Sequence, residues 1–214
     1  MRVAVVGASG YTGLELLRLL VRHPELEIVA LTSERQAGTL LGDVYPAFRG
    51  VLDQRFEAVD AAAIAARAEF AFAALPHTAS APVVRELVQA GVSVVDLSAD
   101  FRLRNAETYA AWYGAHRAPE LLGKSVYGIP ELHRAAIREA QLVAAPGCYP
   151  TSVLLPLAPF LRAGLGQYRG KGYLLHLGGF ARTLVSCSRD FDLIAWFFGL
   201  LRLEHDIAHG LGPE

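Results

Sequence analysis

The sequence predicts an α/β fold in which a doubly wound parallel sheet of the Rossmann type carries helices on both faces. Three observations support this prediction. Residues 2–6 form a β-branched run without polar alternation, as in a strand buried on both faces. A glycine-rich turn, residues 7–13, follows at once. Beyond it, strand-like and helical patterns alternate along the chain, which is typical of this fold class.

The individual elements are predicted from hydrophobic spacing and from turn residues. Apolar residues at positions 14, 17, 20 and 21 predict a first helix, which should end before Pro24. Further strands are predicted at residues 27–32, 70–75, 92–97 and 142–145. Further helices are predicted at residues 82–90, 105–113 and 131–140, with a helix-like apolar stretch at residues 152–161.

Composition excludes several classes of function. Lysine and arginine number 20 against 21 acidic residues, so there is no excess of positive charge for nucleic acid. Hydrophobic residues make up 53%, which excludes intrinsic disorder. The longest strongly apolar run, residues 193–201, is about half a membrane span, and residues 1–7 lack a signal-peptide pattern. We therefore expect a cytoplasmic protein that binds neither membranes nor nucleic acid.

The glycine turn is a candidate nucleotide site. Residues 7–13 read GASGYTG, so the glycines are spaced as GxxGxxG, a variant of the dinucleotide fingerprint. A turn without Cβ atoms lets backbone N–H groups approach a pyrophosphate, and the next helix directs its positive end at it. The placement between a buried strand and a helix favours dinucleotide binding over a tight turn that binds nothing.

The end of the second strand bears on the choice between NAD and NADP. An acidic residue there would hold the ribose 2′-hydroxyl of NAD, whereas arginine favours the 2′-phosphate of NADP. Ser33 and Arg35 suit the phosphate, because they offer a hydroxyl beside a guanidinium group. Glu34 argues for NAD unless it points into solvent. We predict NADP(H).

Cys148 is the candidate nucleophile. It follows a predicted strand and precedes the helix-like stretch, with Pro150 in the first helical turn. We expect it at the carboxyl edge of the sheet, where open α/β folds bind ligands, and a helix N-terminus favours the reactive thiolate. The alternative is a buried structural cysteine. Cys187 has no such setting and is interpreted as incidental.

Four further motifs accompany the glycine turn. They read LPH at residues 75–77, VDLSADFRL at 95–103, YGIPEL at 127–132 and PGCYPT at 146–151. With these motifs, residues 1 to about 165 resemble the N-acetyl-gamma-glutamyl-phosphate reductases of arginine biosynthesis. The YPT sequence after the cysteine favours this family over its lysine-pathway relatives. Aspartate-semialdehyde dehydrogenase shares the architecture and chemistry but not these motifs.

The resemblance implies an NADPH-dependent reduction of a small acyl phosphate. Cys148 would attack N-acetyl-gamma-glutamyl phosphate to form a thioester, and hydride transfer would then give N-acetylglutamate 5-semialdehyde. It also implies a homo-oligomer in the intact family. The implied cofactor contacts are Gly7, Ser9, Gly10, Tyr11, Thr12 and Gly13 at the pyrophosphate, Ser33 and Arg35 at the adenosine end, and Leu75, Pro76 and Ser98 on the nicotinamide side.

Other residues near these motifs have alternative interpretations. His77 follows a strand beside the cofactor and is interpreted as loop support rather than as a catalytic base. Arg102 could bind a substrate carboxylate or phosphate, pair with Asp100, or lie in a solvated loop. The aromatic residues at helical spacing, Tyr109, Trp112 and Tyr113, are interpreted as packing residues.

The family pattern is lost near residue 165. The family continues through a second α+β domain that supplies the catalytic histidine, and residues 166–214 do not match it. His205 and His209 share a helix face but have no third ligand, so no metal site is predicted. We assign residues 1–147 to an NADP-binding domain and 148–165 to the start of a truncated second (α+β) catalytic domain, with 166–214 left as an unassigned tail.

Three functional hypotheses remain open at this stage. We expect the tail to come from a frameshifted or truncated reading frame, which predicts NADP(H) binding with little or no turnover because the general acid–base is lacking. The chain is then an impaired cofactor-binding module. The other two hypotheses are an active reductase and an enzyme similar to aspartate-semialdehyde dehydrogenase.

Overall fold

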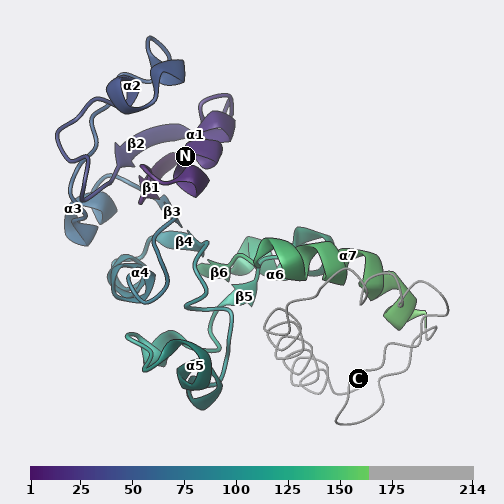
Figure 1. The fold of residues 1–214 in the computed structure, drawn as a ribbon. Helices are drawn as coiled ribbons and strands as arrows, with labels where there is room; N and C mark the ends of the chain where they lie inside the picture. Colours follow the sequence, from purple (N-terminus) through teal and green to yellow (C-terminus); the bar gives the residue numbers. More distant parts are fainter. Residues whose placement is uncertain (164–214) are drawn as a thin grey trace, which may run out of the picture. The chain divides into compact units, whose positions relative to one another are not determined.

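The computed structural model describes residues 1–163, and within them six strands form one sheet in which every neighbouring pair is parallel (Figure 1). The strand order is β2-β1-β3-β4-β6-β5. The strands are β1 (Arg2–Val6), β2 (Glu27–Leu31), β3 (Phe70–Ala73), β4 (Ser93–Asp96), β5 (Val126–Tyr127) and β6 (Leu142–Ala144). The predicted parallel α/β sheet is therefore confirmed.

Helices connect these strands in the alternating order that the sequence predicts. They are α1 (Tyr11–Leu20), α2 (Leu41–Val44), α3 (Ala61–Ala65), α4 (Ser80–Gln89), α5 (Ala106–Tyr113), α6 (Pro130–Glu139) and α7 (Cys148–Arg162), with 3₁₀ turns η1 (Pro46–Phe48) and η2 (Pro119–Leu121). The sequence does not predict α2, α3 or the edge strand β5. These elements span only one or two turns or a single pair of residues, too little for a hydrophobic period to appear.

Helix starts are fixed by local chemistry. The side chain of Asp60 accepts the N–H of Ala63 and begins α3, and the side chain of Asn105 accepts the N–H of Thr108 and begins α5. Both satisfy a donor that has no partner inside the helix. Proline opens α6, where its missing N–H costs nothing.

Successive residues of β1 point to opposite faces of the sheet. Val5 lies in a buried cluster with Leu17 of α1, whereas Val6 lies in a second buried cluster with Val84 and Leu87 of α4. The side-chain period of a strand is two residues, so α1 covers one face and α4 the other. This arrangement makes the sheet doubly wound, as predicted.

The strand order reverses beside β1. The chain passes from β1 to β2 on one side of it and then returns to β3 on the other. At such a switch point the connections diverge to opposite faces and leave a crevice beyond the carboxyl ends of the strands, where open α/β sheets bind ligands. The glycine turn follows β1 at this point.

The chain divides into two compact units, Met1–Pro146 and Gly147–Glu214. The first contains the whole sheet and helices α1 to α6. In the second, the structure describes α7. Among residues 1–163, no helix is long and apolar enough to cross a membrane.

A candidate dinucleotide site at the glycine turn

The first and last glycines of the turn are required by packing within the protein. Gly7 has a φ of +83°, and a Cβ there would lie 2.6 Å from the carbonyl oxygen of Ala74 in the loop after β3. A Cβ on Gly13 would lie 2.6 Å from the Cα of Ala8. These distances are too short for a side chain, so glycine is needed at both positions to bring the turn against β3 and to pack α1 against the turn.

Among residues 1–163, no contact requires glycine at position 10. Its φ of −88° is open to any residue, and a Cβ there would approach nothing nearer than the carbonyl oxygen of Gly7 at 3.8 Å. The missing side chain therefore leaves the backbone open from outside. This is the condition that the close approach of a pyrophosphate requires.

The N-terminus of α1 presents hydrogen-bond donors at this opening. Gly10 is the N-cap residue and no side chain caps the helix. The N–H of Leu14 donates to the carbonyl of Gly10 at 2.9 Å, so the helix itself offers no acceptor to the amides of residues 11–13. Tyr11 is 91% exposed and Thr12 is also exposed. The free amides and the helix dipole suit a diphosphate group.

Ser9 is fixed by two contacts from distant parts of the chain. Its hydroxyl forms a 2.6 Å hydrogen bond with the hydroxyl of Ser33, and its carbonyl accepts the phenol of Tyr45 at 2.6 Å. The Ser33 hydroxyl also accepts the N–H of Gln36 at 3.3 Å. The glycine turn and the end of β2 are thus joined directly, as a shared nucleotide site requires.

Glu34 has a structural partner. Its Oε1 accepts the N–H of Val59 at 2.9 Å, so this carboxylate caps the chain as it returns beside β2. Arg35 is exposed, and Ser33 is 5% exposed. One oxygen of the acidic residue that sequence alone leaves as a potential ligand for a ribose hydroxyl is therefore bound within the protein, while the residue stays exposed.

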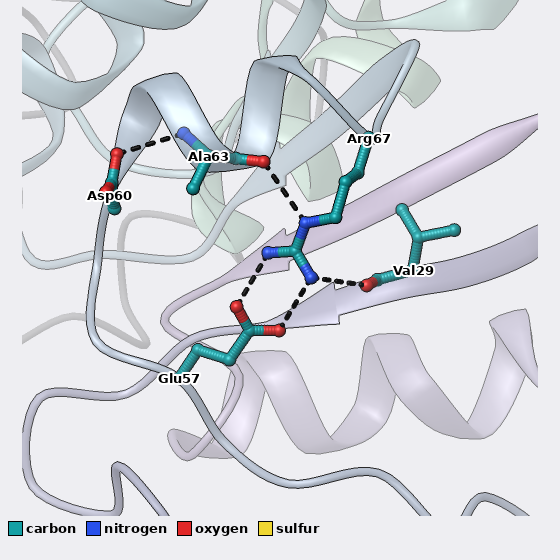
Figure 2. Close-up of polar contacts among 5 residues, drawn as sticks. All are labelled: Val29, Glu57, Asp60, Ala63 and Arg67. Atoms are coloured by element: carbon teal, nitrogen blue, oxygen red, sulfur yellow. Dashed lines mark hydrogen bonds and ion pairs between the residues drawn. The ribbon is translucent and has the colours of Figure 1, made fainter.

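The returning segment pairs beside the end of β2 through one parallel bridge between Thr32 and Glu57, and it is anchored by an ion pair. The N–H of Glu57 donates to Leu31 and the carbonyl of Glu57 accepts the N–H of Ser33, both at 2.8 Å. Figure 2 shows Arg67 holding the Glu57 carboxylate by two hydrogen bonds, Nη1 to Oε1 at 3.0 Å and Nη2 to Oε2 at 2.6 Å. Glu57 raises the pKa of Arg67 above its ordinary value through this bond. Arg67 also donates to the carbonyl of Val29 in β2.

The loops after β3 and β4 follow the carboxyl ends of these neighbouring strands. Pro76 is exposed, and the Leu75 Cδ2 atom lies 3.1 Å from the place a Cβ of Gly7 would occupy. Ser98 is 3% exposed. Its hydroxyl donates to Asp96 Oδ2 at 2.6 Å and accepts the N–H of Asp100 at 3.0 Å. The hydroxyl thus already donates one hydrogen bond and accepts another within the protein. A cofactor contact by Ser98 stays a prediction.

Asp96 ends β4 as a buried carboxyl group. Ser80 of α4 donates its hydroxyl to Oδ1, and Ser98 donates both its N–H and its hydroxyl. Burial raises the pKa of Asp96 above the ordinary value of 3.8, and these three hydrogen bonds counteract the shift in part.

Arg102 joins the carboxyl ends of two strands. Its Nε donates to the carbonyl of Ala145 at 2.8 Å and its Nη2 to the carbonyl of Leu97 at 2.9 Å. The sequence leaves open an ion pair with Asp100 and a position in a solvated loop. The structure instead shows Arg102 bonded to two main-chain carbonyls. Arg102 holds the chain after β6 beside the chain after β4.

His77 and the aromatic residues of α5 lie in contact. The rings of His77 and Tyr113 are 5.7 Å apart, and those of Tyr109 and Tyr113 are 5.0 Å apart. His77 is exposed, Tyr109 is fully buried, and Trp112 is 50% exposed. The packing interpretation fits Tyr109 best.

Cys148 is the first residue of α7 and is exposed. Thr151, three residues later, donates both its N–H and its hydroxyl to the carbonyl of Gly147, at 3.1 and 2.9 Å. Pro150 is buried in the first turn. The structure therefore does not place this thiol in a sealed apolar core. Cys187, His205 and His209 lie outside the described residues.

Sequence reasoning missed Tyr45, Glu57 and Arg67. Each acts over a long stretch of chain, as Tyr45 does when it bonds to Ser9. No local pattern could have found them. Arg67 and Glu57 belong to no sequence motif, so the sequence gives no sign that they pair.

Comparison with known proteins gives the family. The family described as semialdehyde dehydrogenase, NAD binding domain, matches residues 2–140. N-acetyl-gamma-glutamyl-phosphate reductase of Geotalea daltonii is 52% identical over 165 residues, covering 77% of this chain and 48% of that protein. The enzyme of the same name from Magnetococcus marinus is 55% identical over 166 residues, covering 77% and 48%. The chain thus spans about half the length of these curated relatives.

Solved structures show the same fold. Aspartate semialdehyde dehydrogenase with NADP from Candida albicans matches with a TM-score of 0.56 at 18% identity, over 75% of this chain and 46% of that one. Aspartate semialdehyde dehydrogenase II from Vibrio cholerae matches with a TM-score of 0.54 at 23% identity, over 76% and 46%. With the match over residues 2–140, the chain belongs to the semialdehyde dehydrogenase family through its NAD-binding domain.

Proposed function

We propose that the unit Met1–Pro146 binds NADP(H) at the glycine turn. The pyrophosphate would lie against the amides of residues 11–13, at the backbone that Gly10 leaves open. Ser9 and Ser33, which share a hydrogen bond, would define the side toward β2. Because the strand order is β2-β1-β3, a dinucleotide with its adenosine half over β2 must extend its other half over β3. Leu75 and Pro76 follow β3 and would meet the nicotinamide.

The proposed preference for NADP rests on Glu34. Its Oε1 accepts the N–H of Val59, which holds the side chain of the residue that would favour NAD toward another partner. Arg35 is exposed beside it and offers a fork of donors that matches a phosphate.

We further propose that the protein reduces N-acetyl-gamma-glutamyl phosphate with Cys148 as nucleophile. The thiolate would attack the acyl carbon and form a C–S bond, while the C–O bond to phosphate breaks and inorganic phosphate leaves. Bound NADPH supplies a hydride to the carbon of the resulting thioester. Collapse of the Cys148 hemithioacetal then returns the electron pair to sulfur and releases N-acetylglutamate 5-semialdehyde.

The observation that carries this proposal is the exposed thiol of Cys148 at the first residue of α7. The reaction needs a thiol that the substrate can reach, and an exposed side chain meets this requirement. The curated relatives, at 52% and 55% identity, bear the name of the enzyme that performs this reduction.

The reaction is tested in reverse with the full chain. N-acetylglutamate 5-semialdehyde, phosphate and NADP⁺ should give NADPH, followed by absorbance, and Cys148→Ser should abolish the signal. Cys187→Ser is the matched control and should retain it. Aspartate semialdehyde in place of the acetylated aldehyde should react poorly. Faster oxidation of aspartate semialdehyde would instead assign the chain to the chemistry of its structural neighbours.

A cofactor-binding module without turnover is the second candidate function. It is favoured by the organisation of the unit Met1–Pro146, which contains the whole sheet, its buried clusters and the glycine turn. A folded chain that binds NADPH but produces no phosphate-dependent signal with either aldehyde supports this candidate over the reductase.

A further inference from the structure

The loop after β3 contains a strained residue. Thr78 has a φ of +65°, and it is the one non-glycine residue with positive φ among residues 1–163. Threonine is β-branched and disfavours this left-handed conformation. Such strain persists only where the surroundings impose it, and it is concentrated at ligand-binding loops. Thr78 stands two residues after Pro76, at the switch point of the sheet.

Asp100 bonds directly to this strained residue. Its Oδ1 accepts the N–H of Thr78 at 2.8 Å and the hydroxyl of Tyr109 at 2.8 Å. Its Oδ2 accepts the N–H of Ala81, in the first turn of α4, at 2.9 Å. Asp100 is fully buried. A buried carboxylate with fixed donors on both oxygens gives a rigid attachment for the loop.

Asp100 is itself fixed at its main chain. Its N–H donates to the hydroxyl of Ser98 at 3.0 Å, and its carbonyl lies 2.8 Å from Nε2 of His116. The ring of His116 packs at 4.5 Å from that of Tyr109. The attachment of Thr78 is thus tied to the loop after β4 and, through Tyr109, to α5.

We propose that Asp100 is a positioning residue, which holds the loop from Leu75 to Thr78 in the conformation that receives the nicotinamide half of the dinucleotide. This inference rests on the proposed function, which places the nicotinamide against Leu75 and Pro76. A carboxylate that only caps α4 would support the fold without any preference for one half of the cofactor. Loss of a positioning residue should therefore weaken binding only of ligands that carry the nicotinamide half, whereas loss of a helix cap should not distinguish between ligands.

The test compares two probes on the full chain. NADPH carries the nicotinamide, whereas adenosine 2′,5′-bisphosphate lacks it. Asp100→Ala should raise the Kd for NADPH about tenfold, the loss that one hydrogen bond to a charged group produces, and leave the Kd for adenosine 2′,5′-bisphosphate within about twofold. The fluorescence of bound NADPH should also move toward that of free NADPH. An equal change for both probes, or no change, overturns the proposal.

Rescue separates loop conformation from general stability. Glycine adopts positive φ without strain, so Thr78→Gly in the Asp100→Ala background should recover most of the lost NADPH affinity while leaving the melting temperature low. Failure of this rescue in a folded double variant overturns the proposal. Asp60→Ala is the control, because it removes the carboxylate that caps α3; it should lower stability and leave the ratio of the two Kd values unchanged.

Folding of the variants does not decide the outcome. If Asp100→Ala fails to fold, Tyr109→Phe removes one donor to Oδ1, and the ratio of the two Kd values should shift in the same direction by about threefold. An unchanged ratio in that variant overturns the proposal. If the wild-type chain binds neither probe, the proposed function fails, before any variant is measured.

Discussion

The three glycines of one turn are needed for different physical reasons. Gly7 and Gly13 leave room for protein atoms at 2.6 Å, whereas Gly10 faces nothing nearer than 3.8 Å. Sequence spacing identifies all three as one motif. The contacts separate those that shape the fold from the one that leaves space for a ligand.

Gly10→Ser should separate binding from folding. Serine is a preferred N-cap residue, so the melting temperature should stay constant or rise. Its side chain would occupy the space open to a pyrophosphate, and NADPH affinity, measured by fluorescence titration, should fall at least about tenfold.

Gly13→Ala is the matched control for that prediction. Its Cβ would overlap the backbone of Ala8, so it should lower the free energy of unfolding by about 1–3 kcal/mol. Normal NADPH binding by Gly10→Ser would contradict the proposed site.

Cofactor choice should depend on Arg35 and not on Glu34. Arg35→Ala should weaken NADPH binding about tenfold, the value of one charged hydrogen bond, and leave NADH binding unchanged. Glu34→Gln keeps an oxygen for the N–H of Val59 and should leave NADH binding unchanged as well. Weaker NADH binding by Glu34→Gln would show that the carboxylate holds a ribose hydroxyl. Equilibrium titration with both nucleotides measures each case.

At the scale of elements, contacts between residues far apart in the sequence hold short segments in place. Glu57 pairs beside the end of β2, and Arg67 holds its carboxylate by two hydrogen bonds. The side chains are 41% and 42% exposed, so solvent screens part of the attraction. The fork geometry still distinguishes arginine from lysine here.

Arg67→Lys should lower the free energy of unfolding by about 1 kcal/mol, because a lysine cannot form the two parallel bonds. Urea titration measures this change. Arg18→Lys is the control: Arg18 pairs with Glu15 at the surface, with side chains 63% and 65% exposed, and its loss should cost no more than about 0.3 kcal/mol. Equal effects would contradict the anchoring role of Arg67.

The carboxyl group at the end of β4 should make stability depend on pH. Burial raises the pKa of Asp96 in the folded chain, so the folded state favours the neutral acid. The neutral Asp96 carboxyl therefore contributes to the free energy of unfolding. This contribution is full below the ordinary pKa of 3.8, which applies to the unfolded chain, and it is lost as pH rises through the raised pKa of the folded chain. The stability of the wild type relative to Asp96→Asn should therefore fall from pH 4 to pH 8. Urea titrations across this range test it, and a constant difference would contradict it.

At the scale of the whole molecule, sequence predicts the long helices from their hydrophobic period and the buried parallel strands from short continuous apolar runs. The strand predicted at 70–75 is β3 (Phe70–Ala73), and the helix predicted at 82–90 is α4 (Ser80–Gln89). Sequence places the glycine turn but not the direction of side chains. Glu34 shows this, because its partner Val59 lies in a segment that meets the end of β2 only in the folded chain.

The fragment Met1–Pro146 should fold by itself. It contains both buried clusters and every residue proposed for the cofactor. We expect one cooperative thermal transition by circular dichroism, and a Kd for NADPH within about threefold of the full chain. An unfolded fragment, or a folded one that does not bind NADPH, would show that the binding unit needs residues beyond Pro146.

The return of the chain at Glu57 has a consequence for redesign. Because Glu57 and Val59 provide the hydrogen-bond partners of Ser33 and Glu34, the turn after β2 is not an independent cassette. Grafting a turn without an acceptor at position 34 would leave the N–H of Val59 without its partner. A transplant intended to switch coenzyme would have to carry residues 57–59 along with the turn.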